Sequence, residues 1–171
     1  MSDTPRFDSR TIALHWLSAA AIAVMWLLGQ TIDFFPRDQR YLALSTHVAL
    51  GFALVAIIAA RLSWRLGGGQ KLPPAEAGAL GKAAIGVHHL LYLLILVVLG
   101  LGLAVEAMRG DFLFHLIQLP LIAPVDRTLR RAVNGYHALL ADGLVILAVL
   151  HAAAAIWHHV VKRDGVLLRM R

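Results

Sequence analysis

The segment VNGYHALLADGLVILAVLHAAAAIWHHVV, residues 133–161, decides the fold of this chain. It is apolar and longer than the ~20 residues that an α-helix needs to cross a bilayer. It also carries His137 and His151, which are 14 residues apart. Fourteen residues is close to four helical turns, so both side chains share one helix face, roughly 21 Å apart along the axis. Ionisable side chains in a membrane segment are costly and indicate a functional site.

The rest of the chain is equally apolar. Of its 171 residues, 59% are hydrophobic and 15% are charged, and the mean hydropathy is +0.71. Three further segments, at about residues 11–31, 44–66 and 82–105, are long enough to span a membrane. We therefore expect an all-α integral membrane protein, a bundle of four transmembrane helices in a single domain over residues 1–171. The stretch Phe112–Ala123 is too short to cross and is interrupted by Pro120 and Pro124, so we expect an interfacial segment.

Lysine and arginine are distributed unevenly between the two ends of these segments. The N-terminus, the connection between the second and third spans and the C-terminus carry ten of them, and the other connections carry six. This bias predicts that both termini are cytoplasmic. Orientation and lipid headgroups account for the basic residues better than nucleic acid does, because these residues lie between apolar segments. The absence of cysteine excludes disulfides, thiolate–iron clusters and thiol catalysis.

Two further histidines complete two pairs in this topology. His15 lies about one turn into the first span and His47 near the outer start of the second. The predicted depths give an inner pair, His15 with His151, and an outer pair, His47 with His137. Two imidazoles from different helices across a gap suit a six-coordinate haem iron, so we expect one haem at each pair. A metal transporter or sensor is the alternative. Such sites usually recruit carboxylates or thiolates, and the only acid within the four predicted spans is Asp142.

Several short motifs make the chain resemble the bacterial cytochrome b561 family, in particular its short four-helix superoxide oxidases. They are LHWL at 14–17, FFPR at 34–37, HVALG at 47–51, HLLYLL at 89–94, LHAAAAIWHH at 150–159 and LLRM at 167–170. The resemblance covers nearly the whole chain. It implies two b haems, bound by residues that match His15, His47, His137 and His151, in the bacterial inner membrane.

The resemblance also implies an activity. Superoxide oxidases oxidise periplasmic superoxide to dioxygen and reduce ubiquinone to ubiquinol nearer the cytoplasmic side. A di-haem electron-transfer cytochrome that serves a partner dehydrogenase or a periplasmic redox protein would share every haem ligand. The two functions therefore both stay open at the level of the sequence.

Candidate residues for the quinone lie at the cytoplasmic side. His158 is seven residues beyond His151, on almost the same face and roughly 10 Å closer to the cytoplasm. His88 lies at the cytoplasmic start of the third span. Histidine can donate both a hydrogen bond and a proton to a quinone oxygen. Trp16 and Trp157 are candidates for the walls of this site.

Candidate residues for superoxide lie at the outer side. Basic side chains near the outer pair would raise the local concentration of a small anion. Asp142 is expected either to orient an imidazole or to be hydrogen-bonded and neutral, and His115 to be a surface residue. The basic candidates shortly precede the outer histidines; they are Arg37, Arg40, Arg130 and Arg131.

Overall fold

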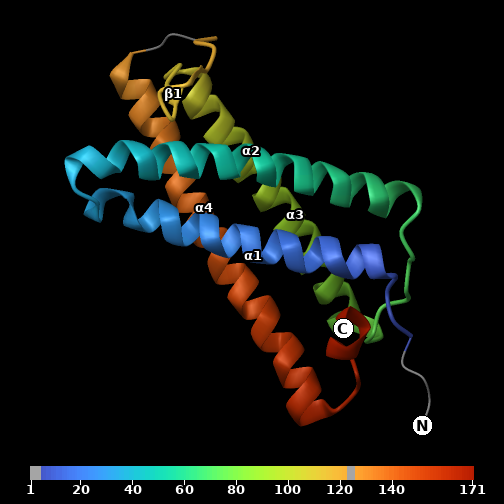
Figure 1. The fold of residues 1–171 in the computed structure, drawn as a ribbon. Coiled ribbons are helices and arrows are strands. Elements are labelled where there is room, and N and C mark those ends of the chain that lie inside the picture. The colour runs from blue at the N-terminus through green and yellow to red at the C-terminus, as the bar shows by residue number, and fades with distance from the viewer. Residues whose placement is uncertain (1–4, 123–125) are drawn as a thin grey trace.

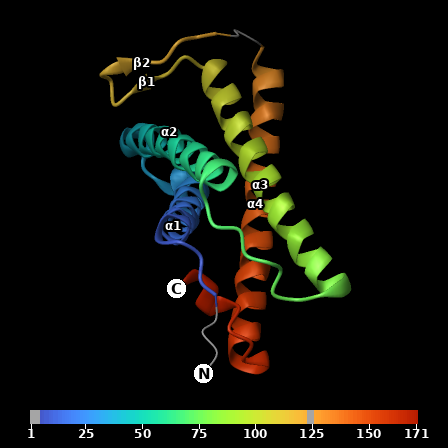
Figure 2. The same cartoon turned by 90° about the vertical axis from the view of Figure 1, so that its right-hand side faces the viewer.

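A computed structural model describes residues 5–122 and 126–171 of the chain. Its long helices are α1 (Ser9–Thr31), α2 (Arg37–Gly67), α3 (Gly78–Ala107) and α4 (Arg127–Trp157). Among the described residues, four helices are long and apolar enough to cross a membrane, which confirms the all-α class. α1 packs along α2 and α3 along α4, and the two hairpins cross each other (Figures 1 and 2).

The helices extend beyond the apolar segments predicted from the sequence. α2 begins at Arg37 rather than near residue 44, α3 at Gly78 rather than 82, and α4 at Arg127 rather than 133. The start of α4 is fixed by Asp126, whose side chain accepts a hydrogen bond from the amide of Leu129 at 2.7 Å. The predicted bounds differ because hydropathy identifies only the apolar part of a helix. The helical backbone continues through polar residues to the capping residue.

A small buried core joins the four helices. It consists of Leu54 and Ile58 from α2, Ile95 from α3 and Leu144 from α4, and Met25 of α1 packs against it. Outside this core the helices expose many large apolar side chains, as expected for helices that meet lipid rather than water.

The predicted interfacial segment contains a short β-hairpin. Strands β1 (Phe112–Leu113) and β2 (Ile117–Gln118) pair antiparallel, with Phe112 opposite Gln118. The hairpin follows α3 and lies at one end of the molecule (Figure 1). Ala123, the last residue of the predicted segment, and Pro124 lie outside the described residues.

The opposite end of the molecule gathers three parts of the chain. The amide of Phe7 donates to the carbonyl of Arg169 at 3.0 Å, and the Arg169 guanidinium donates to the carbonyl of Pro73 at 2.7 Å. Both views place this end away from the β-hairpin (Figures 1 and 2). α4 is extended there by the π-helical turn η2 (His158–Lys162), and the chain closes with the 3-10 turn η3 (Leu167–Met170).

Asp8 ties the start of α1 to the end of α2. Its carboxylate accepts from the amide and the hydroxyl of Thr11 at 2.9 and 2.6 Å, from the indole of Trp64 and from the amide of Gln70. These hydrogen bonds, first that from the Thr11 hydroxyl, hold the pKa of Asp8 well below its ordinary value.

Candidate functional site

The structure brings the four span histidines together in the two pairs that the sequence predicted. The ring centroids of His15 on α1 and His151 on α4 are 6.4 Å apart, and those of His47 on α2 and His137 on α4 are 6.3 Å apart. A metal–imidazole bond is about 2 Å long and the ring centre lies about 1 Å behind the ligand atom, so rings on opposite sides of one ion have centroids about 6 Å apart. Each pair therefore has the spacing to hold one metal ion between two helices.

The rings of the outer pair pack against glycines on neighbouring helices. A Cβ added at Gly29 of α1 would lie 3.3 Å from Cε1 of His47, and one at Gly102 of α3 would lie 3.0 Å from Cε1 of His137. Neither glycine could be selected from the sequence, because a lone glycine in an apolar span is also a common helix-packing residue.

The outer rings also differ in their hydrogen bonds. Nδ1 of His137 lies 2.9 Å from the carbonyl oxygen of Val98. Donation from this nitrogen fixes the tautomer and leaves the Nε2 lone pair available to a metal. Nδ1 of His47 is buried and has no hydrogen-bond partner among the described residues.

The inner pair has two close neighbours, Arg61 and His88. The ring of His88 lies 5.1 Å from that of His151. Arg61 approaches Nδ1 of His15 at 3.0 Å and donates to the hydroxyl of Ser18 at 2.6 Å. Arg61 lies near the end of the second predicted span, a position from which a long side chain can reach the membrane surface. The structure instead turns it into the protein, where Ser18 is fully buried.

The contact between Arg61 and His15 constrains the tautomer. A guanidinium only donates, so Nδ1 of His15 accepts here and the proton of the neutral ring sits on Nε2. With this contact kept, metal binding through Nε2 requires that Nε2 release its proton. Arg61 then places a positive charge next to the inner pair.

Comparison with known proteins identifies the family. A family model described as prokaryotic cytochrome b561 matches residues 6–171. The chain belongs to the cytochrome b561 family. A Yersinia pestis protein named "Probable superoxide oxidase CybB" is 28% identical over 96% of this chain and 95% of its own length. "Cytochrome b561 homolog 1" of Escherichia coli is 29% identical, covering 96% of both chains, and "Cytochrome b562" of Cereibacter sphaeroides is 27% identical over 99% and 98%.

Membership makes the chain a membrane-embedded redox cytochrome of the prokaryotic inner membrane, with haem b as the implied cofactor. The residues at both pairs fit such a group. Each pair has the spacing to hold one metal ion, and the rings of the outer pair lie against glycines that leave room for them.

An open polar cleft of about 440 Å³ lies at the end of α3 and the start of α4 in this cytochrome. Arg130 and Arg131 line it, as does Asn134, three residues before His137. The cleft also includes Arg109, which pairs with Asp111 at 2.5 Å. Arg109 was not among the predicted residues, because it precedes the β-hairpin and is distant from the histidines along the chain.

The other two arginines predicted for superoxide lie elsewhere. Arg37 is the exposed first residue of α2. Arg40 folds back onto the 3-10 turn η1 (Ile32–Phe34), where it donates to the carbonyl of Asp33 at 2.9 Å and approaches its carboxylate at 3.7 Å. Arg40 therefore has a local partner in the turn between α1 and α2.

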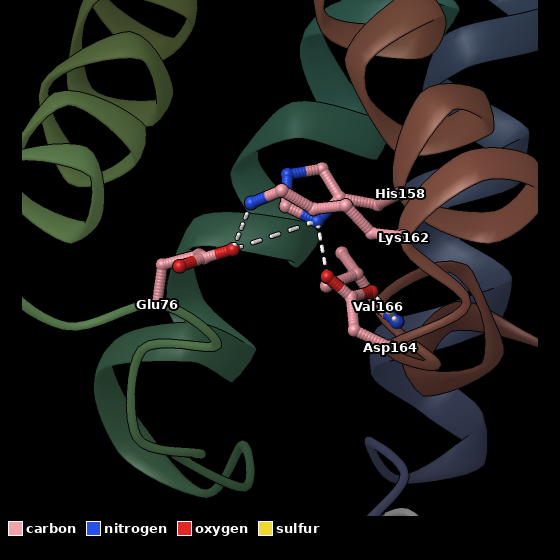
Figure 3. A network of polar contacts seen from close by, with 5 residues as sticks. All are labelled: Glu76, His158, Lys162, Asp164 and Val166. Atoms are coloured by element: carbon pink, nitrogen blue, oxygen red, sulfur yellow. Dashed lines mark hydrogen bonds and ion pairs between the residues drawn. The ribbon is translucent and has the colours of Figure 1, made fainter.

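At the cytoplasm-facing end predicted from the sequence, His158 lies in a cluster of charged groups (Figure 3). Its Nδ1 is 2.5 Å from Asp164 and 3.9 Å from Glu76, and Lys162 pairs with Glu76. His158 was predicted without its acidic neighbours, because Glu76 lies in a distant connection and Asp164 follows the last helical turn.

Trp16 and Trp157 are both exposed, and the indole of Trp16 donates to the carbonyl of Met170 at 2.8 Å. Trp16 thereby contacts the C-terminal turn η3. Trp157 is the last residue of α4, directly before His158.

Asp142 and His115 have defined partners. Asp142 of α4 accepts hydrogen bonds from the side chains of Trp26 and Gln30 of α1, at 2.8 and 2.7 Å. Asp142 therefore joins α4 to α1 through two hydrogen bonds. His115 is an exposed residue of the β-hairpin whose ring stacks on Tyr41, with centroids 3.9 Å apart.

Proposed function

We propose that this chain is a di-haem cytochrome b that oxidises superoxide on the periplasmic side and reduces ubiquinone near the cytoplasmic side. Both termini are cytoplasmic in this proposal, which agrees with the distribution of lysine and arginine. Two superoxide anions lose one electron each and leave as dioxygen. One ubiquinone gains both electrons and two protons.

The observation that carries the proposal is the presence of two histidine pairs, with centroid distances of 6.3 and 6.4 Å, on opposite halves of α4. His47 and His137 would hold the outer haem, and His15 and His151 the inner one. Bound haem b supplies a one-electron couple at each pair. The 14-residue separation spaces the two positions by roughly 21 Å along the helix, so one rigid element holds both.

The arginine-lined cleft supports superoxide as the donor. The cleft is lined by Arg109, Arg130 and Arg131. It also includes Asn134, which is less than one helical turn from His137 on α4. Positive side chains around an opening attract a small anion and raise its association rate. Asp111 neutralises part of this charge through its ion pair with Arg109, which leaves Arg130 and Arg131 as the main source of attraction.

The cytoplasmic histidines support a quinone as the acceptor. His158 and His88 both lie on the cytoplasmic side of the outer pair, and His88 is adjacent to the inner pair. A quinone carbonyl needs a hydrogen-bond donor, and its reduction needs protons that an imidazole can transfer. His158 is the stronger of the two candidates, because acidic side chains already contact its ring.

The proposal is tested by stopped-flow visible spectroscopy of the haem-loaded protein in detergent. Superoxide should reduce the haem within the mixing experiment, and ubiquinone should reoxidise it. Haem that dithionite reduces but superoxide leaves oxidised would refute superoxide as the donor and favour the electron-carrier function. A haem spectrum that ubiquinone leaves reduced would refute the acceptor.

A further inference from the structure

The turn that follows η2 contacts His158 from one side. The chain changes from α to π winding at His158, and Arg163 then adopts a left-handed backbone with φ of 55°. This reversal brings Asp164 back beneath the imidazole, where Oδ2 lies 2.5 Å from Nδ1 of His158. The other carboxylate oxygen of Asp164 accepts from the amide of Val166 at 3.1 Å. Both oxygens are thus engaged, and the carboxylate has a fixed orientation (Figure 3).

Glu76 approaches the same ring from the connection before α3. Its Oε1 lies 3.9 Å from Nδ1 of His158 and also pairs with Lys162. The backbone of Glu76 packs against Gly81. A Cβ at position 81 would collide with the carbonyl oxygen of Glu76. The charged groups that face the imidazole are therefore Glu76, Asp164 and Lys162, from the connection, the terminal turn and η2.

The ligand atoms of Glu76, His158 and Asp164 lie within 4.8 Å of one another, which is a spacing that a metal ion could also use. Lys162 argues against a metal, because its ammonium group already neutralises Glu76 and a cation would have to displace it. What remains is an imidazole whose Nδ1 contacts one unshared carboxylate, that of Asp164.

The charge on Asp164 supports this arrangement. Partial burial acts to raise the pKa of Asp164, but hydrogen bonds from His158 and the Val166 amide, together with the charge of Lys162, bring it below its ordinary value. Asp164 is therefore a carboxylate at neutral pH and does not share the proton of the ring.

We propose that Asp164 is the positioning residue that makes His158 the proton donor to the bound quinone. The inference rests on the proposed function, since it assumes that the acceptor is a quinone. Asp164 accepts from Nδ1–H, which directs Nε2–H away from the carboxylate and toward the quinone oxygen. As an electron arrives, the Nε2–H bond breaks and an O–H bond forms on the quinone. Cytoplasmic water then returns a proton to Nε2, and the second electron repeats the step.

The test is the pH dependence of haem reoxidation by ubiquinone-1, measured by stopped flow in the full haem-loaded chain. In Asp164→Asn the amide can still contact the ring, but the charge is lost. The midpoint of the pH profile should fall by about one unit, which lowers the rate about tenfold on the alkaline side. Reduction by superoxide should be unchanged. Lys162→Gln, which frees the Glu76 charge, should move the midpoint in the opposite direction.

Two controls separate the possible failures. Asp38→Asn, an exposed acid in the first turn of α2, is the matched substitution and should leave the profile unchanged. Long-range ¹H–¹⁵N spectra of histidine-labelled protein should show the same displacement for the protonation of the His158 ring. If ubiquinone reoxidises wild type and Asp164→Asn with the same profile, the inference is overturned while the proposed function stands. If ubiquinone fails to reoxidise wild type, the proposed function itself fails.

Discussion

Replacing Arg61 by glutamine should lower the midpoint potential of the inner haem by about 100 mV. A positive charge stabilises the reduced state, which carries one more electron, so removing that charge makes reduction harder. Arg61 lies 3.0 Å from Nδ1 of His15 and is also held by Ser18 and by the ring of Tyr92, 5.2 Å from its centroid. Its charge is thus fixed near the inner pair by three contacts.

The magnitude follows from this distance. The width of the imidazole and a metal–nitrogen bond place the guanidinium about 7 Å from a metal ion on the far ring nitrogen. At an effective dielectric constant of about 20, a unit charge at about 7 Å interacts with one electron by about 2 kcal/mol. For a one-electron couple, at about 59 mV per tenfold change in the equilibrium constant, this energy corresponds to about 100 mV.

The assay is a potentiometric titration followed by visible spectroscopy, in which wild type should show two one-electron waves. One wave should move to lower potential in Arg61→Gln and the other should stay nearly fixed. Arg65→Gln is the control, because Arg65 is exposed on the same helix, 5.8 Å from the centroid of Tyr92. Unchanged waves in Arg61→Gln, or an equal shift in Arg65→Gln, would contradict the reasoning.

Three other predictions follow from the structure. Gly102→Ala places a Cβ 3.0 Å from Cε1 of His137 and should alter the electron paramagnetic resonance signal of one haem, whereas Gly100→Ala, with nothing within 4 Å, should not. Arg131→Gln should slow superoxide-driven reduction several-fold at low ionic strength and little at high salt, and a salt-independent loss would argue against steering. Because the pKa of Asp8 is depressed, its stabilisation is present above pH ~4 and is lost as the pH falls further, so amide exchange at the start of α1 should accelerate only there.

The helices and the histidine pairs could be predicted because both depend on regular features of the sequence, namely the length of apolar segments and the helical repeat. Apolar runs of the length of a bilayer indicate the four helices, and the 14-residue interval places His137 and His151 on one face of α4. The partners, His47 and His15, follow from the depth that each position has in an antiparallel arrangement. Helix ends were less predictable, because α2 and α4 run on into polar sequence that hydropathy does not mark.

The surroundings of the pairs could not be predicted, because they depend on tertiary contacts. Nothing in the local sequence distinguishes an arginine that reaches the membrane surface from Arg61, which turns toward Ser18 and His15. The approach of Asp164 to His158 depends on a π turn and one left-handed residue, and neither has a clear sequence signal.

The central claim, that two histidine pairs each hold one haem b, is tested most directly by the haem-to-protein ratio of histidine variants, measured as the pyridine haemochrome. Wild type should carry two haems, and His47→Ala and His15→Ala one each. The double variant of His47 and His137 should still carry one, because both residues serve the same haem, whereas the double variant of His47 and His15 should carry none. A wild-type ratio of one, or equal ratios in the two double variants, would contradict the assignment.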